Sequence, residues 1–171
     1  PNLDGIYLPG GFPDILAEQL AANRKMRRRI KQSAEDEMPI YCEHGGLMYL
    51  TESMTNFEGS TYRMVDVLSG SALMEKKLQA IDSTIMETIN DNMVSREEDV
   101  IHGHEFHFSK ISDIPQDAKF AYKMQIGEGI DGEHDGWIEH NILALLGHLH
   151  FAFNAKFASN LVKSCEQYRR R

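Results

Sequence analysis

Residues 39–50, Pro-Ile-Tyr-Cys-Glu-His-Gly-Gly-Leu-Met-Tyr-Leu, decide the fold. The apolar run 40–43 predicts a β-strand, and residues 47–50 predict the start of a helix. The two glycines between them let the chain turn sharply, which holds the apex residue His44 in a strained conformation with its side chain exposed. The helix start behind the apex offers free N–H groups to a developing oxyanion. The pattern is typical of a nucleophile elbow, although such turns more often serve packing alone.

The first fifty residues contain the same order of elements twice: a strand, a glycine turn and a helix. A strand is predicted over residues 5–8, where Pro9-Gly10-Gly11 ends it. A helix is predicted over residues 14–34, with an imperfect apolar stripe at Leu16, Leu20, Met26 and Ile30. This alternation indicates an α/β domain with parallel strands and with loops gathered at their carboxyl ends.

The middle and end of the chain differ from this beginning. Strands are predicted over residues 64–68, 78–86 and 101–109, the last two antiparallel, with a turn at residues 69–71. Glycines and acids dominate residues 127–136, which indicates a loop or hairpin tip. The apolar segment 142–146 precedes the pair His148 and His150, and residues 157–168 are predicted to form a closing helix.

The composition of the 171 residues is that of one soluble domain, with 42% hydrophobic and 26% charged residues. A formal charge of −8 argues against nucleic-acid binding. No stretch has the roughly 18 consecutive apolar residues of a membrane helix. The basic cluster from Arg24 to Lys31 is interpreted as a solvated helix face next to other domains. Cys42 and Cys165 form no metal or redox motif and favour a reducing compartment, hence the cytoplasm.

Histidines form the third notable pattern. In a strand, alternation places His102, His104 and Phe106 on one face and Glu105 with His107 on the other. Imidazole and carboxylate are standard zinc ligands, but the spacing matches no closed zinc motif. We therefore predict no metal here.

The sequence resembles the glutaminase domain of cobyrinate a,c-diamide synthase. The matching blocks keep their order along nearly the whole chain; they are residues 6–14, 20–24, 39–41, 45–50, 78–80, 103–107 and 148–152. The resemblance implies a flavodoxin-like class I glutamine amidotransferase fold, with three α/β/α layers and a central mixed, mostly parallel sheet. Enzymes that amidate nickel sirohydrochlorin share much of the pattern, so the tetrapyrrole substrate stays open.

The resemblance also implies a two-domain enzyme of cobalamin biosynthesis. An N-terminal domain would use ATP and Mg to activate carboxylates of a tetrapyrrole, and the present domain, residues 1–171, would hydrolyse glutamine to supply ammonia. No G-x-x-x-x-G-K-[ST] run occurs, so the ATP-binding synthetase domain is absent from this chain. The expected partners are glutamine or ammonia and that synthetase domain, which would bind most of the tetrapyrrole. A homodimer is compatible with the sequence.

The family pattern at the elbow is Glu-Cys-Gly-Gly, whereas this chain has Glu43-His44-Gly45-Gly46. By resemblance His44 takes the nucleophile position and His148 is the general base and acid. Gly10 or Gly11, with Gly45, would supply oxyanion N–H groups. The resemblance also gives a set of supporting residues: Glu43, Gly46, His104, Glu105, His107 and His150.

Three hypotheses follow from the histidine at this position. In the first, glutaminase activity is impaired and the synthase uses free ammonia. In the second, the chain is a non-catalytic module with a degenerate glutaminase fold, which binds a ligand or supports a synthetase domain. In the third, another nucleophile such as Cys42 acts, or the cysteine was lost by mutation or sequence error.

Overall fold

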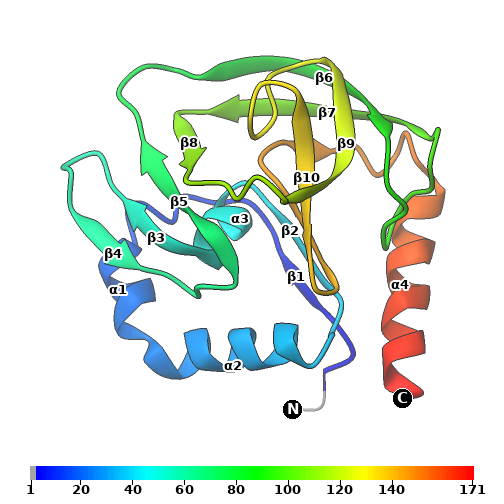
Figure 1. Ribbon diagram of the computed structural model, residues 1–171, viewed down its shortest axis with the longest axis horizontal. Helices are drawn as coiled ribbons and strands as arrows, with labels where there is room; N and C mark the ends of the chain where they lie inside the picture. Colours follow the sequence, from blue (N-terminus) through cyan, green and yellow to red (C-terminus); the bar gives the residue numbers. More distant parts are fainter. Residues whose placement is uncertain (1–2) are drawn as a thin grey trace.

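The computed structural model describes residues 3–171, so the first two residues of the expected domain lie outside it. Figure 1 shows the elements in chain order. The strands are β1 (Ile6–Leu8), β2 (Ile40–Glu43), β3 (Thr51–Thr55), β4 (Thr61–Arg63), β5 (Leu68–Met74), β6 (Ala80–Thr88), β7 (Val100–His107), β8 (Ser109–Ser112), β9 (Lys119–Ile126), β10 (His134–Glu139), β11 (Ile142–Leu145) and β12 (His148–Leu149). The helices are α1 (Ala17–Ala22), α2 (Arg24–Glu35), α3 (Gly45–Leu50) and α4 (Lys156–Arg169).

The main sheet has eight strands in the order β1-β2-β11-β10-β9-β6-β7-β12. The mixed sheet is confirmed, because β1, β2 and β11 run parallel while the other pairs are antiparallel. The expectation of a mostly parallel sheet is wrong. A connection of two residues joins β10 to β11, and so short a hairpin can link only antiparallel strands.

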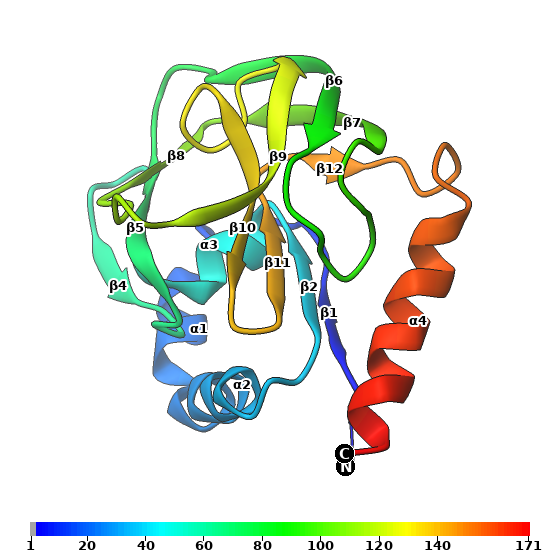
Figure 2. The ribbon, with the colours of Figure 1, turned by 45° about the vertical axis from the view of Figure 1, so that its right-hand side comes forward.

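Helices cover both faces of the sheet, which confirms the three-layer architecture. Along β2, Ile40 and Cys42 pack into one apolar cluster with residues of α1, α2 and α3. The intervening Tyr41 faces the opposite cluster, which contains Phe157 of α4. Figure 2 shows α4 and α2 on opposite sides of β1 and β2.

A second sheet has the order β4-β3-β5-β8 and corrects two predictions. Residues 64–67 are a connection rather than a strand, and the predicted turn at residues 69–71 lies inside β5. A Cβ at Gly70 would lie 3.0 Å from Ser112 O and 3.2 Å from the Trp137 ring. This glycine therefore marks a close approach inside a strand, and not a turn.

The single helix predicted over residues 14–34 is two helices, α1 and α2. Asn23 leaves the helical region at ψ 63°, and its side chain accepts a hydrogen bond from Met26 N at 3.1 Å. Asparagine is a strong helix cap, and here it begins a new helix in the middle of the apolar stripe. Leu16 and Met26 are consequently 52% and 50% exposed, while Ile30 is buried.

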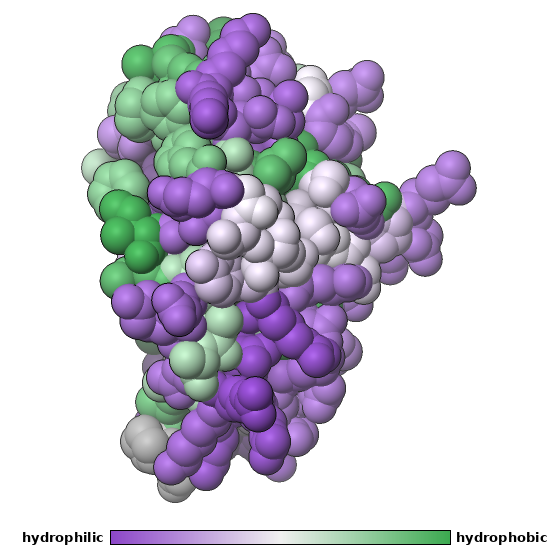
Figure 3. Space-filling model, turned by 90° about the vertical axis from the view of Figure 1, so that its left-hand side faces the viewer, coloured by the Kyte–Doolittle hydropathy of each residue, from purple (hydrophilic) through white to green (hydrophobic). Residues whose placement is uncertain are grey.

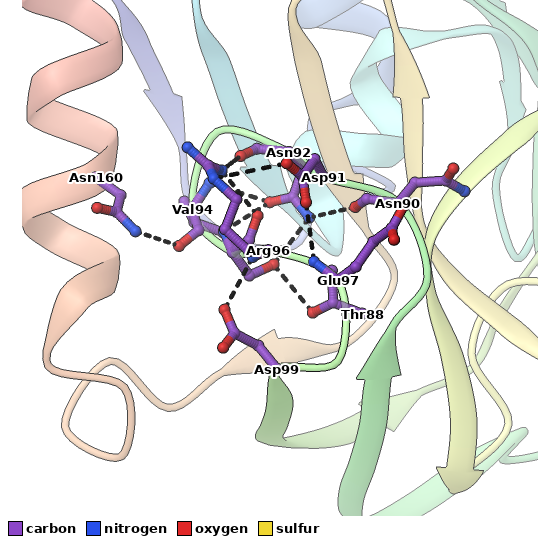
Figure 4. Close-up of polar contacts among 10 residues, drawn as sticks. Thr88, Asn90, Asp91, Asn92, Val94, Arg96, Glu97, Asp99 and Asn160 are labelled. Atoms are coloured by element: carbon purple, nitrogen blue, oxygen red, sulfur yellow. Dashed lines mark hydrogen bonds and ion pairs between the residues drawn. The ribbon is translucent and has the colours of Figure 1, made fainter.

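The loop from Ile89 to Asp99 holds α4 against the sheet (Figure 4). Asn92 Oδ1 accepts hydrogen bonds from the N–H groups of Val94 and Ser95, which closes the loop on itself. Asn160 of α4 donates to Val94 O at 2.8 Å. The closing helix is thus confirmed and tied to the β6–β7 connection.

No helix among residues 3–171 combines the length and apolar character needed to span a bilayer.

Candidate active site

Three parallel strands end at the same edge of the main sheet. The turn with Gly10 follows β1, His44 follows β2, and the segment that leads to His148 follows β11. His44 N donates to Leu145 O at 2.7 Å, so the ends of β2 and β11 are hydrogen-bonded there. The carboxyl edge of parallel strands is the usual place for a ligand site in such sheets.

His44 occupies a strained position at the turn. Its backbone has φ 41° and ψ −101°, a region that costs free energy for any residue with a Cβ. A Cβ on Gly46 would collide with Leu8 O, and one on Gly45 would meet Pro13 Cδ at 2.9 Å. The two glycines are therefore needed for β1, the turn and α3 to approach this closely.

Glu43 and His148 form a hydrogen-bonded pair beside the apex residue. His148 Nδ1 lies 3.0 Å from Glu43 Oε2. The carboxylate is only 5% exposed and also accepts hydrogen bonds from the Tyr41 hydroxyl at 2.5 Å and from Leu149 N at 3.1 Å. Glu43 thus fixes the imidazole ring of His148 and the backbone N–H of Leu149, both in β12.

The charge of Glu43 is preserved in spite of its burial. Burial alone would raise the pKa of this carboxyl, but hydrogen bonds from His148, Tyr41 and the Leu149 N–H lower it below the ordinary value. An ionised Glu43 favours the tautomer of His148 that carries its proton on Nδ1. The Nε2 lone pair is then free to act as a base.

The imidazole of His44 lies among other histidines. Its ring centroid is 5.8 Å from that of His148 and 6.2 Å from that of His107, and its Nε2 is 3.5 Å from Ser109 Oγ. Burial, followed by the repulsion of His148 and His107, lowers the pKa of His44 to about 4. His44 is therefore a neutral imidazole near pH 7.

Backbone donors are available around this site. Within residues 3–171, the N–H groups of Gly10, Gly11 and Gly45 donate no hydrogen bond to the protein. A Cβ on Gly10 would press into the His148 ring, so this loop lies directly against the imidazole. Unpaired N–H groups next to a base are suited to an oxyanion.

Of the other histidines predicted at the site, His107 lies beside the His44 ring, and His104 and His150 lie on the side of His148. The ring of His104 stacks on that of His148 at 5.1 Å, and His150 meets His104 edge-on at 5.4 Å. The alternation predicted for β7 is confirmed, because Glu105 and His107 are buried while His104 is exposed. Burial, then His148 and His150, lower the pKa of His104.

Glu105 and His107 hold neighbouring loops in place. Glu105 accepts hydrogen bonds from Glu128 N at 2.6 Å and Gly129 N at 3.1 Å. Burial would raise the pKa of Glu105, but His107 and these two N–H groups lower it. His107 Nδ1 lies 3.0 Å from Ser109 O. These two residues therefore fix the β9–β10 connection and the first residue of β8.

The family follows from the comparison with known sequences. A model of the CobB/CobQ-like glutamine amidotransferase domain matches residues 1–156. The chain belongs to this family. It is 39% identical to the cobyrinate a,c-diamide synthase of Dehalococcoides mccartyi strain CBDB1, over 98% of the chain and 36% of that protein. It is 38% identical to the Methanosarcina barkeri protein of the same name, over 99% of the chain and 36% of that protein.

Solved structures agree with this amidotransferase domain at the level of the fold. The structure of PurLQS from Thermotoga maritima superposes with a TM-score of 0.67 and 18% identity, over 96% of this chain and 79% of that one. A crystal structure of a glutamine amidotransferase gives a TM-score of 0.68 at 10% identity, over 95% and 79% of the two chains. The class I amidotransferase fold is confirmed.

Four site residues were not identified from the sequence: Tyr7, Tyr41, Ser109 and Asp135. The Tyr7 hydroxyl donates to Glu43 Oε2 at 3.4 Å, and the contacts of Tyr41 and Ser109 are given above. Asp135 is fully buried and accepts hydrogen bonds from Leu146 N at 2.9 Å and Gly147 N at 3.0 Å, the two residues before His148. Burial raises the pKa of Asp135 to about 6, partly offset by these bonds. It lies in the segment interpreted as a loop, but β10 begins at His134, and no sequence pattern signals this contact.

Among residues 3–171, no group of three or more His, Cys, Asp or Glu side chains has the arrangement of a metal site. The rings of His104 and His148 lie nearly parallel, at 23°.

Proposed function

We propose that this chain is the glutamine amidotransferase domain of an ATP-dependent cobyrinate a,c-diamide synthase in which glutamine hydrolysis is impaired and free ammonia is used. The observation that carries the proposal is His44 at the strained apex of an otherwise complete site, beside the His148–Glu43 pair. The chain spans about a third of the length of the curated relatives that it matches. The remainder would supply ATP and Mg chemistry and most of the tetrapyrrole site.

The surrounding residues suit a thioester mechanism with a cysteine at position 44. A thiolate at the apex attacks the carboxamide carbon, and the N–H groups of Gly10 or Gly11 and Gly45 stabilise the oxyanion. His148 Nε2 takes the thiol proton and returns it to the departing ammonia, while Glu43 holds the ring. Water then hydrolyses the thioester to release glutamate.

His44 is a poor substitute in this mechanism. Its neutral ring is bulkier than a thiol, and its Nε2 is directed toward Ser109 Oγ. Loss of a catalytic nucleophile commonly lowers the rate by about 10⁶-fold. The synthetase reaction takes its nitrogen as ammonia, and this ammonia can also come from solution.

Cys42 does not replace the missing thiol. It is fully buried in the apolar cluster on the face of β2 that α1, α2 and α3 cover. Burial, and then the charges of Glu43 and Asp135, raise the pKa of Cys42 well above the ordinary value. A buried, protonated thiol is not a nucleophile.

The test uses the protein with its ATP-dependent domain and compares glutamine with ammonium as the nitrogen source. We expect ATP-dependent amidation of the corrinoid with ammonium alone in the unaltered protein, and restored use of glutamine in the His44→Cys variant. His44→Ala is the matched control, since it removes the imidazole without adding a thiol. Efficient use of glutamine by the unaltered protein would refute impairment. Absence of amidation from both sources in the unaltered and His44→Cys proteins would favour a non-catalytic module.

A further inference from the structure

A basic hollow lies between α1, α2 and β4, and shares no residue with the candidate active site. Its volume is about 810 Å³. Five cations line it, against the carboxylates of Glu18 and Asp66; they are Arg24, Arg27, Arg28, Lys31 and Arg63. In the whole chain 26 Asp and Glu outnumber 18 Lys and Arg, so the net charge of the hollow is opposite in sign to that of the chain.

Most of this positive charge is not cancelled by neighbouring carboxylates. Arg27 donates to Met64 O at 2.8 Å and to Ala21 O at 3.2 Å, and neutral carbonyls orient a guanidinium without removing its charge. Lys31 and Arg63 share one carboxylate, that of Asp66, at 3.1 and 3.3 Å. The hollow thus has more cations than carboxylates, and the hydrogen bonds and ion pairs above hold three of these cations in place before any ligand binds.

Arg24 and Arg28 complete one wall. They are exposed and four residues apart on α2, so their side chains lie one turn apart on the same side of the helix. Neither makes a hydrogen bond or ion pair through its side chain within residues 3–171. In Figure 3 the lower part of the molecule, where α2 lies in Figure 1, is strongly hydrophilic.

The opposite wall and the floor have a different chemistry. Tyr62 and Arg63 come from β4, and Ala21, Ala22 and Val65 add apolar surface between the walls. A ligand that satisfies both walls needs one anionic group for Arg24 and Arg28 and a second for Arg63. Its body would lie against Tyr62 and the small apolar residues.

We propose that this hollow binds an anion that carries at least two carboxylate or phosphate groups. Guanidinium groups bind both of these groups through paired N–H donors, which makes arginine the preferred residue for such ligands. The inference does not depend on the proposed function, because it rests only on the groups that line the hollow.

The test measures binding of citrate and of pyrophosphate to the 171-residue chain by calorimetry, and locates it by amide NMR shifts. We expect saturable binding of at least one probe, with shifts centred on residues 24–31 and 61–66. The tighter probe shows whether carboxylate or phosphate is preferred. Arg24→Glu/Arg28→Glu should weaken binding by about tenfold or more.

Lys25→Glu/Arg29→Glu is the matched control. It makes the same charge change on the same helix with the same spacing, at exposed residues outside the hollow. We expect it to alter the affinity by less than about threefold. Equal weakening by both double variants would show general attraction to a basic helix and overturn the proposal. Lack of saturable binding of both probes, or shifts centred elsewhere, would overturn it as well.

Discussion

His148 Nδ1 lies 3.0 Å from Glu43 Oε2, a contact between residues 105 positions apart in the chain. Glu43 directly precedes the apex residue His44, so the residue that orients the His148 ring and the residue that lies beside this ring are neighbours in the chain. Any displacement of the elbow therefore also moves the imidazole.

Glu43→Gln should disable the base while leaving the fold in place. In a His44→Cys background we expect glutaminase kcat to fall by about 10²–10⁴-fold, because an amide neither fixes the Nδ1–H tautomer nor stabilises the imidazolium. The measurement is steady-state glutamine hydrolysis with its pH profile. Glu37→Gln is a matched control, since Glu37 forms a similar pair with His140 at 3.2 Å away from the site. A kcat within about threefold of the parent would contradict the role of Glu43.

His44 should titrate near pH 4 rather than near its ordinary value, and this can be followed by NMR of the imidazole protons. Because its pKa is lowered on folding, its contribution to stability is complete above about pH 6.5 and is lost as the pH falls toward 4. At pH 5 the loss is about 1–2 kcal/mol. The His44→Asn variant should lack this acid sensitivity in chemical denaturation at pH 7 and 5. Parallel losses in both proteins would show that His44 is not the group concerned.

Asp135→Asn should remove a pH dependence of stability whose sign is opposite to that of His44. The pKa of Asp135 is raised to about 6, so its contribution to stability is present at low pH and is lost as the pH rises through 6. Between pH 7 and 5 the parent should gain about 1 kcal/mol from this group, and the variant should not. The free energy of unfolding in urea at the two pH values measures this. An identical pH dependence of parent and variant would argue that Asp135 is ionised throughout.

Gly46→Ala should destabilise the domain by steric conflict alone. The added Cβ would collide with Leu8 O and lie 2.9 Å from Cys42 Cβ, both in packed strands, at a cost of about 1–3 kcal/mol. Gly59→Ala is the comparison, because its Cβ meets open space and only its φ of 81° is unfavourable. It should cost about 1 kcal/mol. Thermal melts rank the two variants, and a smaller loss for Gly46→Ala would mean that the turn relaxes.

Local patterns in the sequence predicted the elements that lie near the site. The run of residues 39–50 predicted β2, the turn and α3, and the alternation in β7 predicted which histidines are buried. The same reasoning was wrong for residues 14–34, because one capping asparagine outweighed the apolar stripe. It was also wrong for residues 69–71, because Gly70 is required by the Trp137 ring and not by a turn.

The sequence by itself determined the strained position of His44, since strand, glycines and helix are consecutive and their conformations depend on nearest neighbours. It also determined that β1 and β2 end at the same edge, since parallel strands must. Only the tertiary structure decided three contacts. Glu43 faces His148, Asp135 binds the backbone of the segment that precedes His148, and Ser109 lies against His44. Those contacts join segments separated by 11 to 105 positions. Their formation depends on how the strands pair and how the core packs. A local periodicity in the sequence contains no information on either.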